Sequence, residues 1–392
     1  MLKPSTRGPS EESEGRLERV PAPLVEPGPE LTRAQLTRYS RHLLVPGMGI
    51  EAQRRLLAAR VAVVGAGGLG SPILAYLAAA GVGHLTIIDD DVVDASNLQR
   101  QIVHRDDAVG SPKADSAAAF VTALNPDVTV TTRRARITDD NARSLLEGHH
   151  LVLDGADNFP TRYAVADACA ALGLPVVWAA VLRFDAQVSS FVPGGPDAVT
   201  LRDLYPVPPR PEDVPSCAEA GVLGALVGQV GSIMAAEAVK LICGFGEPLV
   251  GRILLIDALT QRTREVPLRP APPVARPHTP EAPMALNELT VEDVAAILDD
   301  PARPTLLDVR EPAEHALGTL PGSLAVPLGD VLSWDRLDDN LPDGPVIVYC
   351  KISPRARRAA AHLVALGHPD VSLMDGGMIA WAERIDPSYP HY

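Results

Sequence analysis

A glycine-rich turn between a strand and a helix is the feature that most constrains this chain. After the apolar run 61–64, Gly65, Gly67 and Gly70 match the pattern G-x-G-x-x-G. Such a turn needs one glycine for the tight bend, one for close approach of a phosphate to the backbone, and one for helix-on-sheet packing. Asp89 ends the next apolar strand, near the roughly 20-residue spacing at which a carboxylate can bind a ribose. The chain is therefore predicted to bind a nucleotide.

Strand-like and helix-like segments alternate from Arg60 onward, which predicts an α/β, doubly wound, Rossmann-like domain with a mainly parallel sheet. The expected strands are 61–64, 85–88, 128–132, 151–154, 176–180 and 251–257. The expected helices are 71–80, 113–124, 139–146, 161–172 and a core helix ending near 241. Ligands of such sheets bind at the carboxyl ends of the strands, where Asp89, Asp154 and Asp157 lie.

Composition divides the 392 residues into a tail, two domains and a linker. Residues 1–30 are rich in charge and proline, which predicts a disordered tail before a domain at 31–266. Recurring prolines predict an extended linker at 267–286. Residues 287–392 again alternate strand and helix, so we expect a smaller second α/β domain there. Its expected strands are 305–310, 346–349 and 371–373.

The formal net charge of −14 argues against non-specific binding to nucleic acid or to an anionic membrane. The apolar run between Glu219 and Glu237 falls short of the roughly 20 residues of a membrane span and contains Gln229, so it is expected to be a core helix. Residues 1–30 have no secretory signal pattern. The four cysteines form no C-x-x-C pair and indicate neither disulfides nor a zinc cage, which predicts a cytoplasmic protein.

The glycine turn alone suits either a nicotinamide dehydrogenase or an enzyme that uses ATP. Arg100 and Lys113 follow Asp89, and a guanidinium with an ammonium suits a triphosphate and its leaving pyrophosphate. A dinucleotide diphosphate needs neither. Asp157, at a strand end, offers a carboxylate for Mg²⁺. Surface ion pairs would explain each residue singly, but their common place around one crevice favours an ATP site.

A further pair of cations lies on an N-terminal helix. Thr32 opens this helix with Gln35 as a capping box, and Arg38 and Arg41 are expected on one of its faces. The pattern leaves two alternatives open, a solvated basic stripe and a phosphate contact.

Cys350 is a second candidate chemical centre. It follows the strand 346–349 and opens a loop into a helix, with Arg355 at the mouth of the loop. Loop N–H groups, the helix dipole and the guanidinium favour a thiolate or persulfide anion. The spacing to the arginine is one residue shorter than in cysteine phosphatases, so it suits a persulfide sulfur better than a phosphate. A small core residue at a strand end is the alternative.

Five motifs resemble the ubiquitin-activating-enzyme superfamily, and within it the prokaryotic sulfur-carrier adenylyltransferases of molybdopterin and thiamine synthesis. These motifs are Gly65–Gly70, Ser96–Gln101, Gly110–Lys113, Asp157–Asn158 and Ser216–Val222. The resemblance covers roughly residues 30–266. It implies that ATP adenylates the C-terminal Gly-Gly carboxylate of a small ubiquitin-like carrier protein.

The resemblance also implies roles for single residues. Gly68 and Asp89 would hold phosphate and ribose, and Asp157 with Asn158 would contact Mg²⁺ and nucleotide. Arg41 matches the arginine that reaches into the partner subunit's site, which implies a homodimer. The triphosphate would be bound by Ser96, Asn97, Leu98, Gln99, Arg100 and Lys113.

Relatives often carry two C-x-x-C pairs that bind a structural zinc. Here Thr200–Asp203 replaces the first pair and the proline linker replaces the second, so no zinc is expected and apolar packing should hold the proline-rich loop 193–215. Cys217 lies in a matched motif and is a candidate for a covalent link to the activated carrier, as a thioester or acyl disulfide. Cys169 and Cys243 lie in apolar helical patterns and are expected in the core.

The C-terminal domain resembles the rhodanese sulfurtransferases in Leu307–Glu311, Leu320–Pro327 and Asp375–Trp381. Its active loop departs from that family: Ser353 replaces a glycine, and Pro354 replaces a residue with an N–H group. Ser353 is expected to be strained, and the proline removes one donor from the anion cradle. Sulfur transfer is expected, with a domain that only docks the carrier or the donor as the alternative.

The two domains together resemble the molybdopterin-synthase adenylyltransferase/sulfurtransferase type. The implied cycle adenylates the carrier, after which a persulfide on Cys350, loaded by a cysteine desulfurase or thiosulfate, attacks the acyl adenylate. Cys217 then releases the carrier thiocarboxylate by disulfide exchange, in molybdopterin, thiamine or cysteine biosynthesis. The implied partners are the carrier, the sulfur donor and a second copy of the chain, with no nucleic acid or membrane.

Overall fold

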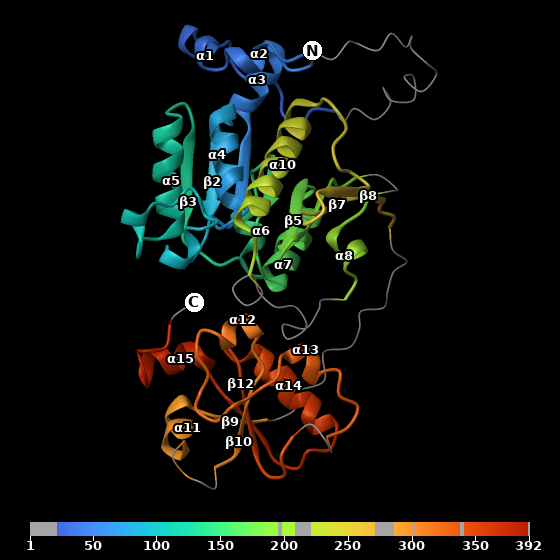
Figure 1. Ribbon diagram of the computed structural model, residues 1–392. Coiled ribbons are helices and arrows are strands. Elements are labelled where there is room, and N and C mark those ends of the chain that lie inside the picture. The colour runs from blue at the N-terminus through green and yellow to red at the C-terminus, as the bar shows by residue number, and fades with distance from the viewer. Residues whose placement is uncertain are drawn as a thin grey trace. The chain divides into compact units, whose positions relative to one another are not determined.

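The computed structural model describes residues 22–194, 198–207, 221–270, 286–298, 300, 303–337 and 341–390. The chain divides into two compact units. The first contains the described residues up to 270, and the second contains those from 286 onward. Each unit has its own sheet and hydrophobic core (Figure 1).

The first unit is built on an eight-stranded sheet with the order β3-β2-β1-β4-β5-β6-β7-β8. Its parallel strands are β1 (Arg60–Val64), β2 (His84–Ile88), β3 (Thr129–Arg133), β4 (Leu151–Asp154) and β5 (Val176–Leu182). The antiparallel strands are β6 (Asp185–Phe191), β7 (Arg252–Asp257) and β8 (Arg262–Pro267). The predicted doubly wound fold is confirmed, whereas β6 and β8 were not predicted. Strand β8 is largely exposed and polar, as suits the edge of a sheet, and so lacks an apolar pattern.

The strand order of this sheet reverses at β1. Strand β2 pairs with one side of β1 and β4 with the other, where Val64 lies opposite Asp154. Ligands of open α/β sheets bind in the crevice at such a switch point, outside the carboxyl ends of the strands. The glycine turn follows β1 and the loop 155–158 follows β4. The fold therefore brings the two predicted nucleotide-binding segments together.

Helices cover both faces of this sheet (Figure 1). One core contains side chains of α3 (Gly49–Ala58), α4 (Gly70–Ala80), α5 (Lys113–Leu124) and α10 (Gly224–Cys243). A second core contains side chains of α6 (Ala142–Leu146) and α7 (Phe159–Leu172). The site at the switch point thus lies at one end of a sheet that is packed on both sides.

Helix α10 alone among the described residues is long and apolar enough to cross a membrane. It has 20 residues, so the expectation that this run is too short for a span was wrong. Most of the helix is buried within the unit, and Met234 and Ala238 are fully enclosed. A Cβ on Gly231 would lie 2.7 Å from the carbonyl oxygen of Leu69, so α10 packs closely on α4. This packing is that of a core helix, as the sequence predicted.

Residues 22–30 are held against the first unit, although the sequence predicted that they belong to a disordered tail. Val25 is buried, and the Leu24 N–H donates to the Leu241 carbonyl oxygen at 3.1 Å. Arg54 Nε donates to the Gly28 carbonyl oxygen at 2.7 Å. The buried Val25 and these two hydrogen bonds together anchor this stretch. Residues 1–21 lie outside the described residues.

The second unit is built on a five-stranded sheet with the order β11-β10-β12-β13-β9, in which every pairing is parallel. The strands are β9 (Asn287–Leu289), β10 (Thr305–Asp308), β11 (Leu324–Ala325), β12 (Val346–Tyr349) and β13 (Val371–Met374). The helices are α11 (Val291–Ile297), α12 (Pro312–His315), α13 (Leu328–Val331), α14 (Pro354–Ala365) and α15 (Gly377–Arg384). The predicted smaller α/β domain is confirmed.

Ser353 joins β12 to α14 in a conformation that favours glycine, with φ 108° and ψ −44°. The strain predicted for this position is confirmed. Its Oγ donates to Asp375 Oδ1 at 2.8 Å and accepts from the Gly376 N–H at 2.8 Å. A Cβ on Gly377 would collide with the Cys350 carbonyl oxygen, so the segment 375–377 packs directly on the active loop. Two hydrogen bonds therefore hold a strained serine in place.

Asp154 ends β4 with its side chain 1 % exposed. Its Oδ1 accepts a hydrogen bond from the Ala156 N–H at 3.0 Å. Burial raises the pKa of Asp154 to about 6, although the charge of Arg162 and the Ala156 N–H act in the opposite direction. Between about pH 4 and pH 6 the folded protein keeps a proton that the unfolded chain has lost. Ionisation of Asp154 therefore lowers stability as the pH rises through this range.

We predict that the Asp154→Asn variant removes this pH dependence, because an amide does not ionise and its oxygen still accepts the Ala156 bond. The free energy of unfolding of the variant should gain up to about 3 kcal/mol relative to the wild type as the pH rises from about 4 to about 7. Calorimetric unfolding of the first unit in the full chain measures this. The exposed Asp157→Asn variant is the control, and parallel pH curves for wild type and Asp154→Asn would contradict the prediction.

We predict that Ser353→Gly is more stable than Ser353→Ala. Both variants lose the two Oγ hydrogen bonds, so they differ only in the Cβ at a positive φ. Relief of about 1–3 kcal/mol of strain should outweigh the roughly 0.5–1 kcal/mol cost of a more flexible glycine in the unfolded chain. Thermal unfolding of the second unit compares them. An alanine variant as stable as the glycine variant would refute the strain.

Candidate functional site

In the glycine turn, backbone atoms pack directly against other backbone atoms. The Gly65 N–H donates to the Ile88 carbonyl oxygen at 2.8 Å, and Gly65 has φ 84°. A Cβ on Gly70 would collide with the Gly65 carbonyl oxygen, and one on Gly68 would lie 2.8 Å from Val227 Cγ1. Helix α4 starts at Gly70 without a side-chain cap. Its N-terminal end can therefore receive an anion.

Asp89 closes the glycine turn from β2. Its Oδ2 accepts from the Ala66 N–H at 2.7 Å and its Oδ1 from the Asp91 N–H at 2.8 Å. Burial raises the pKa of Asp89, while these two N–H groups and the charge of Lys113 act in the opposite direction. The carboxylate predicted to bind a ribose thus also fixes the shape of the turn.

The two predicted triphosphate cations lie beside this turn. Lys113 is the first residue of α5, is 6 % exposed, and its Nζ lies 2.9 Å from Asp91 Oδ2. Arg100 donates from Nη1 to the Ser96 carbonyl oxygen at 3.1 Å, and its side chain runs past Gly68. Its charge is not paired with a carboxylate in these contacts. The structure therefore brings Lys113, Asp89, Arg100 and the glycine turn close together.

The rest of the segment 96–99 is a short turn next to Arg100. Ser96 Oγ donates to Asp94 Oδ1 at 2.5 Å, and Asn97 Nδ2 donates to Ser96 Oγ at 3.4 Å. The Gln99 carbonyl oxygen faces Gly224 at the start of α10, where a Cβ would lie 2.5 Å from it. Leu98 is part of the same turn. These residues place the arginine, and their binding to a nucleotide stays a prediction.

Asp157 and Asn158 follow β4 and are exposed. Asn158 Oδ1 caps α7 by accepting from the Thr161 N–H at 3.0 Å, and Asn158 Nδ2 lies 3.4 Å from Asp157 Oδ1. The neighbouring Gly155 touches the glycine turn, because a Cβ on Gly65 would lie 3.1 Å from its carbonyl oxygen. One exposed carboxylate fits Mg²⁺, which binds through one or two carboxylates together with phosphates.

The sequence did not predict two buried residues that contact the glycine turn and the loop after β4. Arg162, in the first turns of α7, donates from Nε to the Ala156 carbonyl oxygen at 3.1 Å and stacks 5.2 Å from the Phe159 ring. His104 Nε2 lies 2.8 Å from the Ala66 carbonyl oxygen. Burial lowers the pKa of His104, so its neutral ring donates Nε2–H to that carbonyl. Arg162 lies one helical turn after Asn158, and this spacing is the signal that could have indicated it.

No contact among the described residues brings Arg41 to Lys113, Arg100 or the glycine turn. The predicted single helix is broken at the buried Tyr39, between α1 (Arg33–Arg38) and α2 (Ser40–Leu43). The Tyr39 hydroxyl donates to Asp127 Oδ2 at 3.1 Å, which fixes the break. The expectation that Arg38 and Arg41 share one helix face was therefore wrong. Arg41 is exposed, and its reach into a partner subunit stays a prediction.

The segment that replaces the first C-x-x-C pair of the relatives forms a short helix, α8 (Leu201–Leu204). Asp203 Oδ2 accepts from the Thr200 N–H at 2.7 Å in a capping box. Arg202 binds both carboxylate oxygens of Asp167, at 2.8 and 2.6 Å. In the described parts of the chain, no three His, Cys, Asp or Glu side chains gather as metal ligands. Cys217 lies outside the described residues.

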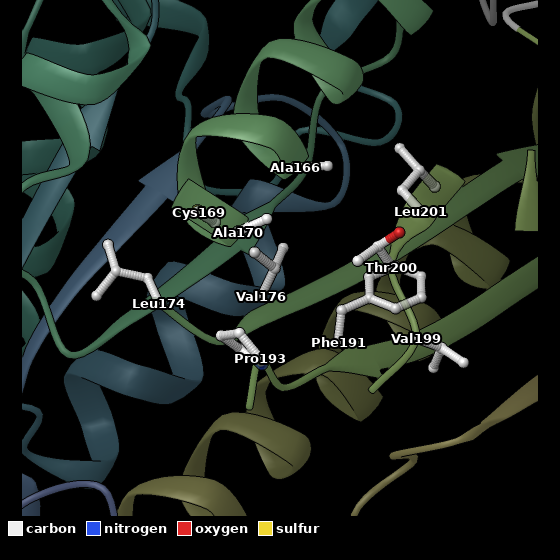
Figure 2. Close-up of a pocket in the computed structure, with 10 residues that line it drawn as sticks. All are labelled: Ala166, Cys169, Ala170, Leu174, Val176, Phe191, Pro193, Val199, Thr200 and Leu201. Atoms are coloured by element: carbon white, nitrogen blue, oxygen red, sulfur yellow. The ribbon is translucent and has the colours of Figure 1, made fainter. Parts of the chain in front are cut away.

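A small cavity of about 20 Å³ lies between α7, β5, β6 and the start of α8 (Figure 2). It is lined by Ala166, Cys169, Ala170, Leu174, Val176, Phe191, Pro193, Val199, Thr200 and Leu201. Such a space holds about one water molecule and has an almost entirely apolar wall, so it is a packing gap. Burial raises the pKa of Cys169 and of Cys243 to about 12, and both are core cysteines as predicted.

Cys350 follows β12 and is fully buried. The Ser353 N–H donates to its Sγ at 3.2 Å. Burial raises the pKa of the Cys350 thiol; the N–H groups of Ala356, Ser353 and Ile352 and the charge of Arg355 act in the opposite direction. The predicted anion cradle is present, but burial outweighs it for the bare thiol. The expectation that the surroundings favour the thiolate therefore does not hold for this state.

Arg355 is paired by a residue that the sequence did not indicate. Its Nη1 and Nη2 bind the two carboxylate oxygens of Glu314, at 2.5 and 2.7 Å. Both side chains are largely buried. Burial raises the pKa of Glu314, but the bonds from Arg355 and the Glu311 N–H outweigh it and the net pKa is lowered. The Arg355 guanidinium beside Cys350 is thus paired with the ionised carboxylate of Glu314.

Known proteins match both units. Residues 39–275 match the ThiF family, and residues 290–384 match the rhodanese-like domain. The chain is 42 % identical over 386 residues to a probable adenylyltransferase/sulfurtransferase MoeZ of Mycobacterium tuberculosis, with 94 % of this chain and 98 % of that protein covered. It is 52 % identical over 242 residues to a SAMP-activating enzyme E1 of Haloferax volcanii, with 62 % of this chain and 88 % of that protein covered.

Solved structures support the fold. E. coli MccB with MccA-N7isoASN superposes with a TM-score of 0.54 at 20 % identity, and the match covers 69 % of this chain and 83 % of that one. The family match removes the nicotinamide dehydrogenase alternative. The chain belongs to the ThiF family and is an adenylyltransferase/sulfurtransferase that carries a rhodanese-like domain.

Proposed function

We propose that this enzyme adenylates the C-terminal Gly-Gly carboxylate of a small ubiquitin-like sulfur carrier and then converts it to a thiocarboxylate. The product would serve molybdopterin, thiamine or cysteine biosynthesis. The observation that carries the proposal is that one chain combines the uncapped start of α4, close to Lys113 and Asp89, with N–H groups that surround the Cys350 thiol. The names of the MoeZ relative and of the SAMP-activating enzyme support it.

In the first step the carrier carboxylate attacks the α-phosphorus of ATP, and pyrophosphate leaves. N–H groups of the glycine turn and of the first turn of α4 hold phosphate oxygens, while Lys113 and Arg100 offset the charge that develops on the leaving group. Asp157 with Asn158 would hold Mg²⁺, which supplies positive charge at the phosphates. Arg41 of a second copy completes the site, so the enzyme acts as a homodimer.

In the second step a persulfide on Cys350 attacks the acyl adenylate, and AMP leaves. The carrier is then joined to Cys350 through an acyl disulfide. Cys217 attacks the sulfur of Cys350, which releases the carrier thiocarboxylate and leaves a Cys217–Cys350 disulfide for cellular thiols to reduce. The N–H groups around Cys350 are placed to stabilise the persulfide anion.

A second candidate is a rhodanese domain that only docks the carrier or donor. The complete burial of Cys350 and the strain at Ser353 favour it.

We further propose that the enzyme contains no zinc, because the capping box of Thr200 and Asp203 and the Arg202–Asp167 pair hold α8. A cytoplasmic enzyme without nucleic-acid or membrane partners agrees with the net charge of −14.

We predict that Lys113→Ala lowers carrier-dependent ATP–pyrophosphate exchange by roughly 10²–10³-fold, the usual loss when a charge-stabilising group is removed. The control is Arg105→Ala. Arg105 pairs with Asp107 at 2.8 Å on the same segment, but both are exposed. This control should exchange at the wild-type rate. Equal losses in the two variants would mean that Lys113 has no specific role in adenylation.

We predict that Cys350→Ser separates the two steps. The variant should keep wild-type ATP–pyrophosphate exchange and lose carrier thiocarboxylate, while Cys217→Ala should trap the carrier on Cys350. Mass spectrometry of carrier and enzyme, with low-molecular-weight sulfide excluded, reports both outcomes. Thiocarboxylate formation at the wild-type rate in Cys350→Ser would favour the docking domain instead.

A further inference from the structure

The pair between Glu314 and Arg355 sets the charge beside the reactive cysteine. Their side chains are 12 % and 8 % exposed, and two hydrogen bonds join them. The Glu311 N–H also donates to Glu314 Oε2 at 2.9 Å, which fixes the carboxylate at the start of α12. Because the pKa of Glu314 is lowered, the carboxylate is ionised at neutral pH. The positive charge of Arg355 is therefore already compensated before any anion arrives.

The backbone around Cys350 can stabilise one negative sulfur atom. The N–H groups of Ile352, Ser353 and Ala356 face Sγ, and Pro354 has no N–H to add. Cys350 itself is 0 % exposed. A donor that presents a single sulfur atom with one charge makes full use of these groups. A dianion with three sulfonate oxygens needs further hydrogen-bond donors and a cation whose charge is not already compensated.

Building on the proposed role of Cys350, we infer that Glu314 is a specificity-determining residue that restricts sulfur loading to singly charged persulfide donors and disfavours thiosulfate. The Cys350 thiolate attacks the outer sulfur of the donor R–S–S⁻, and the bond between the two donor sulfurs breaks. The leaving R–S⁻ takes the proton that the Cys350 thiol gave up. Cys350 keeps the transferred sulfur as a persulfide anion, so atoms and charge balance without another reactant.

The physical basis is charge repulsion in a buried site. An ionised carboxylate repels an entering dianion where water is excluded, and it repels a singly charged donor half as strongly. Removing the charge of Glu314 while keeping its shape should therefore help thiosulfate far more than a persulfide. Glu314→Gln makes this change. Glu292→Gln is the matched control, because Glu292 forms an exposed pair with Arg384 in the same unit.

The test loads the full-length enzyme with sulfur and measures the initial rate of persulfide formation on Cys350 by alkylation and peptide mass spectrometry. The donors are thiosulfate, methanethiosulfonate, glutathione persulfide and a cysteine desulfurase charged with cysteine. Methanethiosulfonate keeps a sulfonyl group but has one charge, so it separates charge from shape. The two persulfides distinguish a small donor from a protein donor.

We expect the wild type to load at least about tenfold faster from each singly charged donor than from thiosulfate at equal concentration, the ratio that about 1.4 kcal/mol gives. Glu314→Gln should raise the thiosulfate rate about tenfold with little change for the persulfides, and Glu292→Gln should match the wild type. If Glu314→Gln does not fold, the inference is tested by the ratio of the wild-type loading rates from methanethiosulfonate and from thiosulfate.

Equal loading of the wild type from thiosulfate and methanethiosulfonate would overturn the inference. So would an unchanged ratio in a Glu314→Gln variant that still loads from glutathione persulfide. A different result would contradict the proposed function itself. In that case Cys350 would not be loaded with sulfur from any of the four donors. The two failures are therefore distinguishable in one set of measurements.

Discussion

The proposed adenylation site depends on direct contacts between backbone segments at the carboxyl end of β1. The glycine turn folds against itself at Gly65 and Gly70, and Gly65 also lies against the carbonyl oxygen of Gly155 after β4. No side chain fits between these segments, so the start of α4 and the loop after β4 lie side by side at the end of the sheet. Asp89 holds the turn by binding the Ala66 N–H. The glycines thus fix the place where we propose that the phosphates bind, and the nearby Lys113 supplies a positive charge there.

The second unit uses the same constraint around its cysteine. Gly377 lies against the Cys350 carbonyl oxygen, and its neighbours hold the Ser353 hydroxyl. Behind the loop, Arg310 makes a fully buried pair with Asp308 and donates to the Gly318 carbonyl oxygen at 2.7 Å. These bonds bracket α12, the helix that presents Glu314. Backbone contacts therefore shape the surroundings of both the glycine turn and Cys350, and a buried ion pair lies beside Cys350.

Patterns with a strong local cause were predictable from the sequence. Helix α5 and strands β4 and β12 have the predicted bounds, because buried strands and a helix that opens after proline leave clear signals. The polar edge strand β8 and the break at Tyr39 were missed, since pairing and burial decide them. Of the candidate site, the glycine turn, Lys113 and Asp89 were predicted from their order and spacing along the chain. Arg162, His104 and Glu314 act through tertiary contacts, which single-sequence spacing does not contain.

We propose that a sulfur atom held on Cys350 in the second unit continues the chemistry that carboxylate activation begins in the first. The most direct measurement loads the enzyme with isotopically labelled sulfane sulfur, removes free donor, and then adds carrier, ATP and Mg²⁺. Mass spectrometry of the carrier should find the labelled sulfur in its C-terminal thiocarboxylate in a single turnover. Carrier that is adenylated but gains no label, while the label stays on Cys350, would contradict the account.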